Sequence, residues 1–479
     1  MPGTPPPPPL ITSALGLGLE AFVAVRAATQ AGVADARAAF ELTLGAPSCD
    51  WGFLVLAGLD PLVDALERLR ARVDELEWLE SVGAIDARTR RRLSESRFAC
   101  DLDAPPEGSI VFPGEAVLTV EGPYWQAQLV GGLIQGAIAE ATLVATRFAR
   151  LGLASGGAEI IEDGAAVAHR LGGVPTLSRA AYVGGARATT SSLAARRYRL
   201  PALAIQPAHL DAAVGSEDRA IRVWLASCEG DCVLRLDAAR AGSALPRLVA
   251  SVRERMHVGS RRVFIALPSG DRAGLARAVA KAFTAAGMAP PPVIVCGEVD
   301  ERLALELRDV AIPVISYALS AEAAPGASHF ARYELVSIED GGSWSSRLRF
   351  GGDAGSSSDP GRKLLVRYSD ASGRPVADVA HAMNERLLRA TGGRYVDRAT
   401  GLGGRLTAVA SAPLRAAVMR AGKRASTSEP SEALRERAQR GLSLLDEGYR
   451  RTVSPARYPV GITPSLAALK AELLGKVTE

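Results

Sequence analysis

Cysteine is scarce in this sequence, and the few that occur do not suggest a disulfide framework. Five cysteines in 479 residues are an odd and sparse set, which fits a reducing cytoplasm better than an oxidising compartment. Cys228 and Cys232 would lie one helical turn apart, but no second Cys/His pair is spaced to complete a zinc site. We therefore predict neither structural disulfides nor a bound metal.

Net charge is also small, at +4 for the whole chain. Three arginine clusters, at 89–92, 196–199 and 261–262, are scattered along the sequence and do not build one basic stripe. Nucleic-acid binding requires a concentrated basic face that neutralises phosphates. We expect these arginines to be solvated and the protein to have no nucleic-acid partner.

Long uninterrupted apolar runs are missing as well. The most apolar stretch, 129–144, contains Gln135, Glu140 and three glycines, so it predicts a buried helix and not a membrane span. The proline-rich start, residues 1–9, lacks the charged start and apolar core of a signal peptide. We expect a disordered tail there, a cytoplasmic protein and no membrane partner.

The remaining chain is long enough for two to four domains. Residues 10–123 predict an N-terminal α/β domain. Between 124 and 335, short apolar runs alternate with amphipathic helices, a pattern that indicates parallel strands closed into an α/β barrel. Residues 336–479 should pack on the N-terminal domain, because neither end has enough alternating strands to form its own core.

Three local patterns inside these domains carry specific expectations. The apolar run 220–226 is interpreted as a barrel strand, and 378–390 as a helix. In SRAAYVGGARATTSSLAARRYRLP, residues 178–201, two glycines interrupt a helix before a strand. Glycines at such a place indicate a backbone that packs close to a substrate or to another helix.

Several of these stretches follow one another as they do in a known family. They include FELTL and FLVLAGLDPLVDALE, then IVFPGEAVLTVEGPYWQAQLV, the stretch 178–201, SGD at 269–271, PGRKLLVRYSD and SPARYPVGITPSLAALKAELL. In this order, over nearly the whole chain, they resemble nicotinate phosphoribosyltransferase. The resemblance implies an irregular, type II phosphoribosyltransferase-like α/β barrel plus a mixed α/β domain built from both chain ends.

The resemblance also implies a reaction. The family joins nicotinate to phosphoribosyl pyrophosphate with ATP hydrolysis, giving nicotinate mononucleotide for NAD salvage, and it does so as a head-to-tail homodimer. If this chain is active in the same way, it would use Mg²⁺ and ATP. Carried over position by position, the catalytic residue would be His209. The substrate-binding residues would be His169, Arg170, Arg179, Gly184, Gly185, Ser269, Gly270, Asp271, Arg362 and Lys363.

Several of these residues also have a purely structural interpretation. A single histidine without a charged partner, such as His169 or His209, is more often structural. Ser269 to Asp271 would suit a turn and helix N-cap. Arg362 and Lys363 would suit a solvated loop.

Several motif positions depart from the family. Ala166, Val167 and Ala266 stand where the family has arginines, and no tyrosine occurs near Leu15. The family's Asp-Thr-Tyr-Asp-Thr strand is placed on 223–229, where no acid or threonine matches, and the phosphate loop at 317–320 has no glycine.

Each lost charge-assisted contact removes on the order of 1.5–3 kcal/mol. We therefore predict catalysis far below that of the family, with Arg170 as the best compensating cation. The alternative is a non-catalytic homologue that acts as a nucleotide sensor or as the partner of an intact enzyme.

Overall fold

A computed structural model describes residues 13–45, 47, 51–163, 174–237, 241–256, 262–267, 270–297, 299–309, 315–319, 330–349 and 358–478. It divides into two compact units. Unit 1 combines Met1–Leu143 with Ala323–Glu479, and unit 2 is Val144–Glu322. The inner unit is therefore shorter at both ends than the 124–335 barrel domain expected from the sequence.

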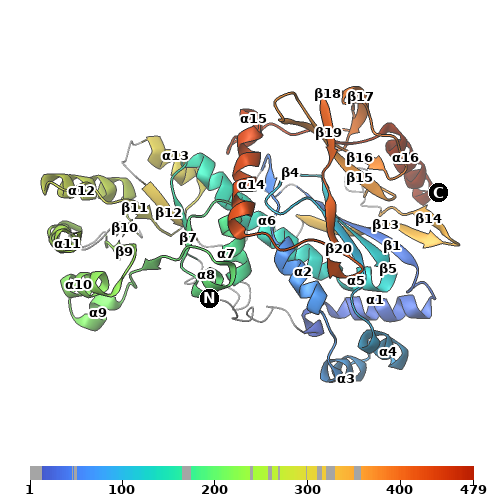
Figure 1. Ribbon diagram of the computed structural model, residues 1–479, viewed down its shortest axis with the longest axis horizontal. Helices are drawn as coiled ribbons and strands as arrows, with labels where there is room; N and C mark the ends of the chain where they lie inside the picture. The colour runs from blue at the N-terminus through green and yellow to red at the C-terminus, as the bar shows by residue number, and fades with distance from the viewer. Residues whose placement is uncertain are drawn as a thin grey trace. The chain divides into compact units, whose positions relative to one another are not determined.

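The main sheet of unit 1 is built from both ends of the chain (Figure 1). Its inner strand β1 is buried along all but its first residue and pairs antiparallel with β5 on one side and β13 on the other. Its seven strands, in spatial order, are β14 (Ser343–Ser346), β13 (Ala331–Asp340), β1 (Arg37–Leu44), β5 (Ala116–Pro123), β3 (Asp101–Ala104), β20 (Ala416–Arg420) and β21 (Lys423–Arg424).

Helices from the N-terminal part of the chain pack around two apolar cores, one shared with this sheet and one formed among the helices themselves. The stretch 129–144, expected to form a buried helix, lies mostly in α6, which is separated from the preceding helix α5 at Val130. The helices of this region are α1 (Leu19–Gln30), α2 (Leu59–Arg68), α3 (Val73–Ser81), α4 (Ala87–Glu95), α5 (Tyr124–Leu129) and α6 (Gly131–Ala154), preceded by a short 3-10 turn η1 (Ala14–Gly16).

A second sheet of unit 1 comes mostly from the C-terminal part. Its six strands, in spatial order, are β18 (Gly403–Thr407), β17 (Thr391–Asp397), β22 (Val460–Ile462), β16 (Pro375–Ala382), β15 (Lys363–Ser369) and β19 (Ala410–Pro413). A short pair, β2 (Leu54–Val55) with β4 (Ile110–Val111), and three helices, α14 (Ser431–Leu444), α15 (Glu447–Arg450) and α16 (Pro464–Thr478), complete the unit.

The predicted helix over 378–390 is wrong, because most of this segment is strand β16 and a turn. Both Asp378 and His381 are fully buried in the strand. Asp378 pairs with Arg367 of β15, and His381 lies 3.0 Å from the hydroxyl of Tyr368. These cross-strand partners make polar side chains tolerable on both faces of a buried strand.

Unit 2 is a barrel of seven parallel strands whose order around the ring is their order in the chain. A parallel bridge between Thr189 and Ala202 joins the two ends of the sheet. The strands are β6 (Ile160–Glu162), β7 (Ala188–Thr189), β8 (Ala204–Ile205), β9 (Cys232–Arg235), β10 (Val263–Leu267), β11 (Val293–Val295) and β12 (Ile315–Leu319). The helices are α7 (Val174–Val183), α8 (Ser192–Tyr198), α9 (Leu210–Val214), α10 (Glu217–Ser227), α11 (Ala241–Met256), α12 (Arg272–Ala285) and α13 (Glu301–Asp309).

The predicted strand at 220–226 is also wrong, since this segment lies in helix α10. Ser216 caps the helix through its side chain, and Ala220, Ile221 and Leu225 form its buried face. The true strand, β9, follows at Cys232–Arg235. Among the described helices, none is both long and apolar enough to cross a membrane.

Candidate active site at the barrel mouth

The interior of the barrel is filled by apolar side chains. Because side chains alternate along a strand, every second residue points inward. One face of β9 and β10 contributes Leu234, Ile265 and Leu267 to the packing against the outer helices. The other face belongs to an inner cluster, formed by Ile161, Ala188, Leu203, Val233, Phe264, Ala266 and Ile294. The barrel is therefore a packed core and not a pore.

Polar residues follow where the same inward faces reach the carboxyl ends of the strands. Asp163 comes directly after β6, Thr190 directly after β7, and Cys296 directly after β11. The Thr190 hydroxyl donates to Asp163 Oδ1 at 3.1 Å. Burial raises the pKa of the Asp163 carboxyl, and the Thr190 bond opposes that rise. The mouth thus holds an acid with a strengthened affinity for its proton.

Arg235 supplies positive charge to this layer. It lies two residues after Val233, on the inward face of β9, and is in register with Ala266 of β10. Its backbone N–H donates to Gln206 Oε1 at 3.0 Å, which fixes its position at the strand end. The residue is exposed, and within the described ranges its guanidinium has no hydrogen bond or ion pair. This arginine is available to an anionic ligand.

Cys296 is not suited to be a nucleophile. Burial raises the pKa of its thiol to about 12, and the negative charge of Asp163 adds to the rise. Arg235 and Arg272 act in the opposite direction, which shows that these charges lie near the sulfur. Arg272 Nη2 also donates to the Cys296 carbonyl at 3.2 Å. At neutral pH the thiol stays protonated and unreactive.

The Ser/Thr-rich segment after β7 is held by the barrel itself. Glu162 is fully buried and accepts a hydrogen bond from the Thr189 hydroxyl, whose oxygen in turn accepts from the Ser191 N–H at 2.9 Å. The Thr190 N–H donates to the Glu162 carbonyl at 2.9 Å. These bonds fix the direction of Thr190 at the mouth.

Gly184 is required by helix packing. A Cβ at this position would lie 2.1 Å from the carbonyl oxygen of Ala145 in α6. Gly185 has open space around it but a φ of +118°, which L side chains rarely adopt. The paired glycines therefore let the end of α7 approach α6 and then turn into β7.

Other proposed site residues lie in structural roles of unit 2. Arg179 is almost completely buried, with its guanidinium 5.5 Å from the centre of the Tyr198 ring. Gly270 adopts a positive φ, and Asp271 caps α12 by accepting from the Gly274 N–H at 2.8 Å. His209 is exposed just before α9, and its side chain makes no capping hydrogen bond. His169, Arg170 and Ser269 lie outside the described residues.

Arg362 and Lys363, in unit 1, are not a solvated loop. Arg362 pairs with Glu121 at 2.8 Å and stacks 4.5 Å from the centre of the Trp344 ring. Lys363 is buried, forms an ion pair with Glu41 at 2.9 Å and donates to the carbonyls of Asp359 and Gly361, each at 2.7 Å. The three donor positions of the Lys363 ammonium group are therefore all used within unit 1.

Comparison with known proteins gives the family. The model of the nicotinate phosphoribosyltransferase N-terminal domain matches residues 21–134, and that of the C-terminal domain matches residues 362–470. The nicotinate phosphoribosyltransferase of Bacillus subtilis is 25% identical over 458 residues, covering 93% of this chain and 92% of that protein. The chain belongs to the nicotinate phosphoribosyltransferase family.

Solved structures agree with the type II phosphoribosyltransferase fold. The crystal structure of human nicotinic acid phosphoribosyltransferase has a TM-score of 0.78 and 24% identity, covering 95% of this chain and 99% of that one. That of nicotinate-nucleotide pyrophosphorylase from Pyrococcus furiosus has a TM-score of 0.68 and 17% identity, covering 90% and 95%.

For a nicotinate phosphoribosyltransferase homologue, the position of β9 changes the motif comparison. The family's Asp-Thr-Tyr-Asp-Thr strand cannot lie on 223–229, because residues up to Ser227 are helix α10. The strand at this point of the fold is β9, and Asp237 follows it by two residues. An acid therefore stands near the strand end where the sequence comparison found none.

Sequence reasoning missed Arg235, Asp163, Thr190 and Cys296. Their shared signal is a position at or directly after the end of a short apolar run. When the strand is predicted at 220–226 instead of at β9, Arg235 falls in a segment predicted to be a loop, and this signal is lost. Among the described residues, no group of three His, Cys, Asp or Glu side chains is arranged to hold a metal ion.

Proposed function

We propose that this protein binds nicotinate and phosphoribosyl pyrophosphate at the barrel mouth and acts in NAD salvage, with a turnover far below that of its family. Family membership supports the reaction class. The observation that carries the binding site is Arg235, which lies on the inward face in register with Ala266 and whose side chain has no hydrogen-bond or ion-pair partner among the described residues. We propose that it substitutes, one strand away, for the arginine that the family resemblance expects at position 266.

We propose reduced turnover because one arginine on a neighbouring strand should bind the substrate phosphates more weakly than the several arginines that the family resemblance implies. Ala266 is buried among the apolar residues of the barrel core and offers no charge. Charge-assisted hydrogen bonds are worth about 1.5–3 kcal/mol each, so the loss of even one costs about tenfold or more in transition-state binding.

Mg²⁺ and ATP belong to the same proposal. Mg²⁺ usually binds through one or two carboxylates together with substrate phosphates, and when bound it would neutralise the pyrophosphate. Asp163 and Asp237 are the carboxylates that follow barrel strands and fit this role. His209 is exposed after β8, where phosphate from ATP could reach it. A cytoplasmic location is part of this proposal as well.

The direct test is formation of nicotinate mononucleotide from both substrates with Mg²⁺, with and without ATP, measured by chromatography. We expect slow product formation by the wild type and at least a tenfold further loss in Arg235→Ala. The double variant Arg235→Ala/Ala266→Arg should recover activity, because it returns a cation to the neighbouring register position. Arg277→Ala, an exposed arginine of α12, is the matched control.

The competing function is a non-catalytic homologue, favoured by the apolar environment of Ala266. Absence of product together with no thermal stabilisation by either substrate would support it. Family-level turnover that is abolished by Arg170→Ala or His209→Ala, and unaffected by Arg235→Ala, would contradict both the impairment and the role of Arg235.

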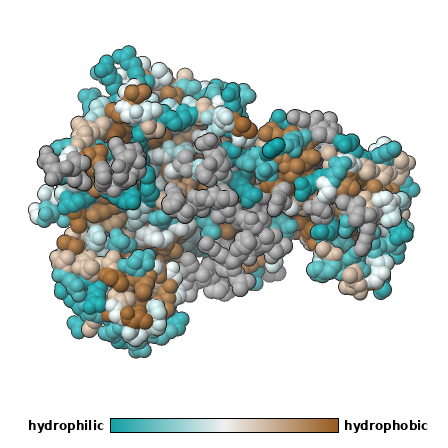
Figure 2. All heavy atoms as spheres, turned by 180° about the vertical axis from the view of Figure 1, so that it is seen from behind, coloured by the Kyte–Doolittle hydropathy of each residue, from teal (hydrophilic) through white to brown (hydrophobic). Residues whose placement is uncertain are grey.

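A homodimer is the expected assembly. Leu15, Leu19 and Val23 are 42–48% exposed, and Leu19 and Val23, four residues apart, lie on the same side of α1. Figure 2 shows further hydrophobic surface on the lobe that carries α3 and α4, where Trp78 is 48% exposed. Exposed apolar surface of this kind is typical of a protein interface.

A further inference from the structure

The arginines at the two ends of the barrel differ in their partners. At the amino ends of the strands, two arginines and two acids directly precede β6, β7, β9 and β10 and form ion pairs with one another. These residues are Glu159, Arg187, Asp231 and Arg262. The charges at this end are therefore satisfied within the protein.

At the carboxyl ends of the strands, two arginines have no acidic partner. Arg235 ends β9, is exposed, and its side chain forms no hydrogen bond or ion pair with the described residues. Arg272 begins α12 and donates through Nη2 to the Cys296 carbonyl at 3.2 Å, but within the described ranges it forms no ion pair. Its Nε is buried and has no hydrogen-bond partner there. A buried donor without an acceptor is unfavourable, which indicates that a ligand completes this site.

The two arginines belong to one layer of the barrel mouth. Arg235 is in register with Ala266 of β10, and Ala266 is in register with Ile294 of β11, two residues before Cys296. The charges of Arg235 and Arg272 both oppose the rise in the pKa of the Cys296 thiol, so both lie near its sulfur. Cys296 therefore marks a point that the two guanidinium groups approach from β9 and from α12.

The acid of this layer does not neutralise either arginine. Asp163 accepts from the Thr190 hydroxyl at 3.1 Å and forms no ion pair with the residues that the structure describes. Burial raises the pKa of Asp163, and the opposing influence comes from Thr190 and not from an arginine. The layer therefore keeps two uncompensated positive charges.

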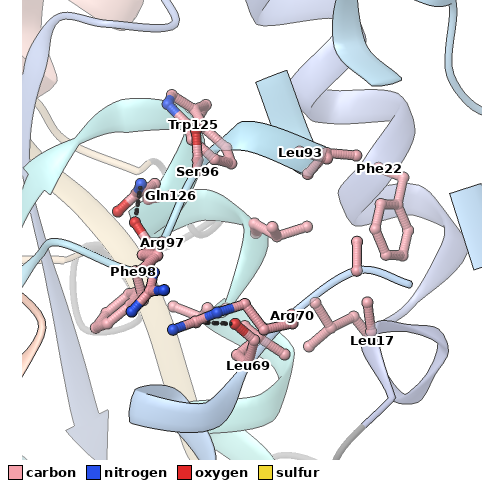
Figure 3. A pocket seen from close by; sticks show the side chains of 14 residues that line it. Leu17, Phe22, Leu69, Arg70, Leu93, Ser96, Arg97, Phe98, Trp125 and Gln126 are labelled. Atoms are coloured by element: carbon pink, nitrogen blue, oxygen red, sulfur yellow. Dashed lines mark hydrogen bonds between the residues drawn. The ribbon is translucent and has the colours of Figure 1, made fainter. Parts of the chain in front are cut away.

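The small hollow of unit 1, among η1, α1, α4 and α5, is not a comparable site (Figure 3). Phe22 and Trp125, which line it, are 1% and 5% exposed and belong to the packed core of these helices. Its space of about 40 Å³ is far below the roughly 300–1,000 Å³ of small-molecule sites. The barrel mouth is therefore the better place for a ligand.

We propose that Arg235 and Arg272 together form one binding site for a diphosphate group. Arg272, fixed at the Cys296 carbonyl, would donate to one phosphoryl group and the unpaired Arg235 to the other, through charge-assisted hydrogen bonds. The inference rests on the proposed function for its natural ligand, the pyrophosphate group of phosphoribosyl pyrophosphate. Two arginines are fewer than the three that the resemblance implies at positions 166, 167 and 266, so reduced turnover is still expected.

The test is calorimetric titration of the full chain with inorganic pyrophosphate, without divalent cations. We expect at least fivefold weaker binding of ribose 5-phosphate, which carries a single phosphoryl group. Arg235→Ala and Arg272→Ala should each weaken pyrophosphate binding about tenfold. Arg272→Lys should weaken it less, because it keeps the charge but loses the planar set of donors. Arg277→Ala removes an equal charge from an exposed position of α12 and should bind like the wild type.

Melting temperatures without ligand show whether each variant is folded. If Arg272→Ala is not, Arg272→Gln takes its place, because its amide can still donate to the Cys296 carbonyl. The inference is overturned if the wild type does not bind pyrophosphate, if the folded Arg272 variant binds it like the wild type, or if ribose 5-phosphate binds as tightly.

The same measurements separate this site from the proposed reaction. Pyrophosphate binding that depends on both arginines, without any formation of nicotinate mononucleotide, would support the site and contradict the proposed turnover. Product formation together with unchanged pyrophosphate binding in Arg272→Ala would overturn the site and leave the proposed reaction in place.

Discussion

Glu115 is a carboxyl group in an environment that strongly disfavours its ionised form. It is fully buried, and its nearest cation, Arg367, is 3.8 Å away and already bound to Asp378 at 2.5 Å. Tyr458 donates to the same Asp378 at 3.1 Å. Burial raises the pKa of Glu115 well above its ordinary value, and the negative charge of Asp378 adds to the rise. Glu115 therefore keeps its proton to a higher pH than an ordinary carboxyl group does.

This pKa gives a stability prediction with a definite sign. A carboxyl whose folded pKa is raised contributes stability in its protonated form, and that contribution is lost as the pH rises through the folded pKa. Glu115→Gln cannot ionise, so we expect its stability relative to the wild type to increase with pH, by on the order of 1–3 kcal/mol. Chemical denaturation at pH 5, 7 and 9 measures this, and parallel pH profiles would contradict it.

Lys363 gives a second prediction at the level of one residue. Its side chain is 1% exposed, and it neutralises Glu41, which also contacts Arg415. Burial lowers the pKa of the Lys363 ammonium, and the negative charge of Glu41 opposes that change. Removal of one partner of a buried pair leaves an uncompensated charge and typically costs about 3–5 kcal/mol.

We therefore expect Lys363→Met to lower the free energy of unfolding by about that amount. The neighbouring Arg362→Ala is the control, since Arg362 is partly exposed and its loss should cost about 1 kcal/mol or less. Denaturant titration of both variants measures the difference. Equal and small effects would show that the buried ion pair contributes little.

At the level of elements, the contact between α7 and α6 depends on Gly184. Gly184→Ala forces a methyl group against the Ala145 carbonyl, so we expect a loss of about 2 kcal/mol or more. Gly136→Ala is the matched control, because Gly136 is an exposed position of α6 with open space around it. That change should stabilise the helix by about 0.5–1 kcal/mol. Thermal unfolding of the two variants should therefore shift in opposite directions.

Elements were predictable from the sequence where the apolar period was unambiguous. The apolar run of β1 is buried along seven of its eight residues, and Asp86 caps α4 by accepting from the Thr89 N–H. The segment 220–226 did not follow the predicted pattern, since its apolar side chains suit either a strand or the buried face of α10. The prediction for β16 was wrong for another reason. The partners of Asp378 and His381 lie in β15, so the sequence of β16 alone does not show that these polar residues are paired.

At the level of the whole molecule, assembly is the testable property. We expect light scattering at micromolar concentration to give the mass of a dimer. Leu19→Asp should shift the mass towards the monomer, because it places a charge beside the exposed Val23 on the same side of α1. Val73→Asp, at an exposed apolar position of α3, is the control. A monomer mass for the wild type would contradict the prediction.

The architecture was more accessible to sequence reasoning than the site. Strand–helix alternation predicted the parallel barrel, and the family resemblance predicted a domain made from both chain ends. The site depends on individual side chains at the ends of strands only two to five residues long. Placing this strand on 220–226 instead of Cys232–Arg235 is enough to hide Arg235 and Asp237, although it leaves the predicted fold class unchanged.

The main sheet of unit 1 also sets the order in which the chain completes its fold during synthesis. Strand β1 acquires β5 early, but its other neighbour, β13, begins about 200 residues after β5 ends. At ribosomal rates this delay is on the order of 10–40 s, while unit 2 is contiguous and emerges in between. Throughout that time one edge of β1 is open to pairing with other chains.

Glu41 lies in the middle of β1, and the residues that neutralise it, Lys363 and Arg415, are synthesised after β13. Its uncompensated charge would disfavour incorrect pairing until the C-terminal segment arrives, so the same carboxylate that stabilises the finished protein protects the unfinished one from aggregation.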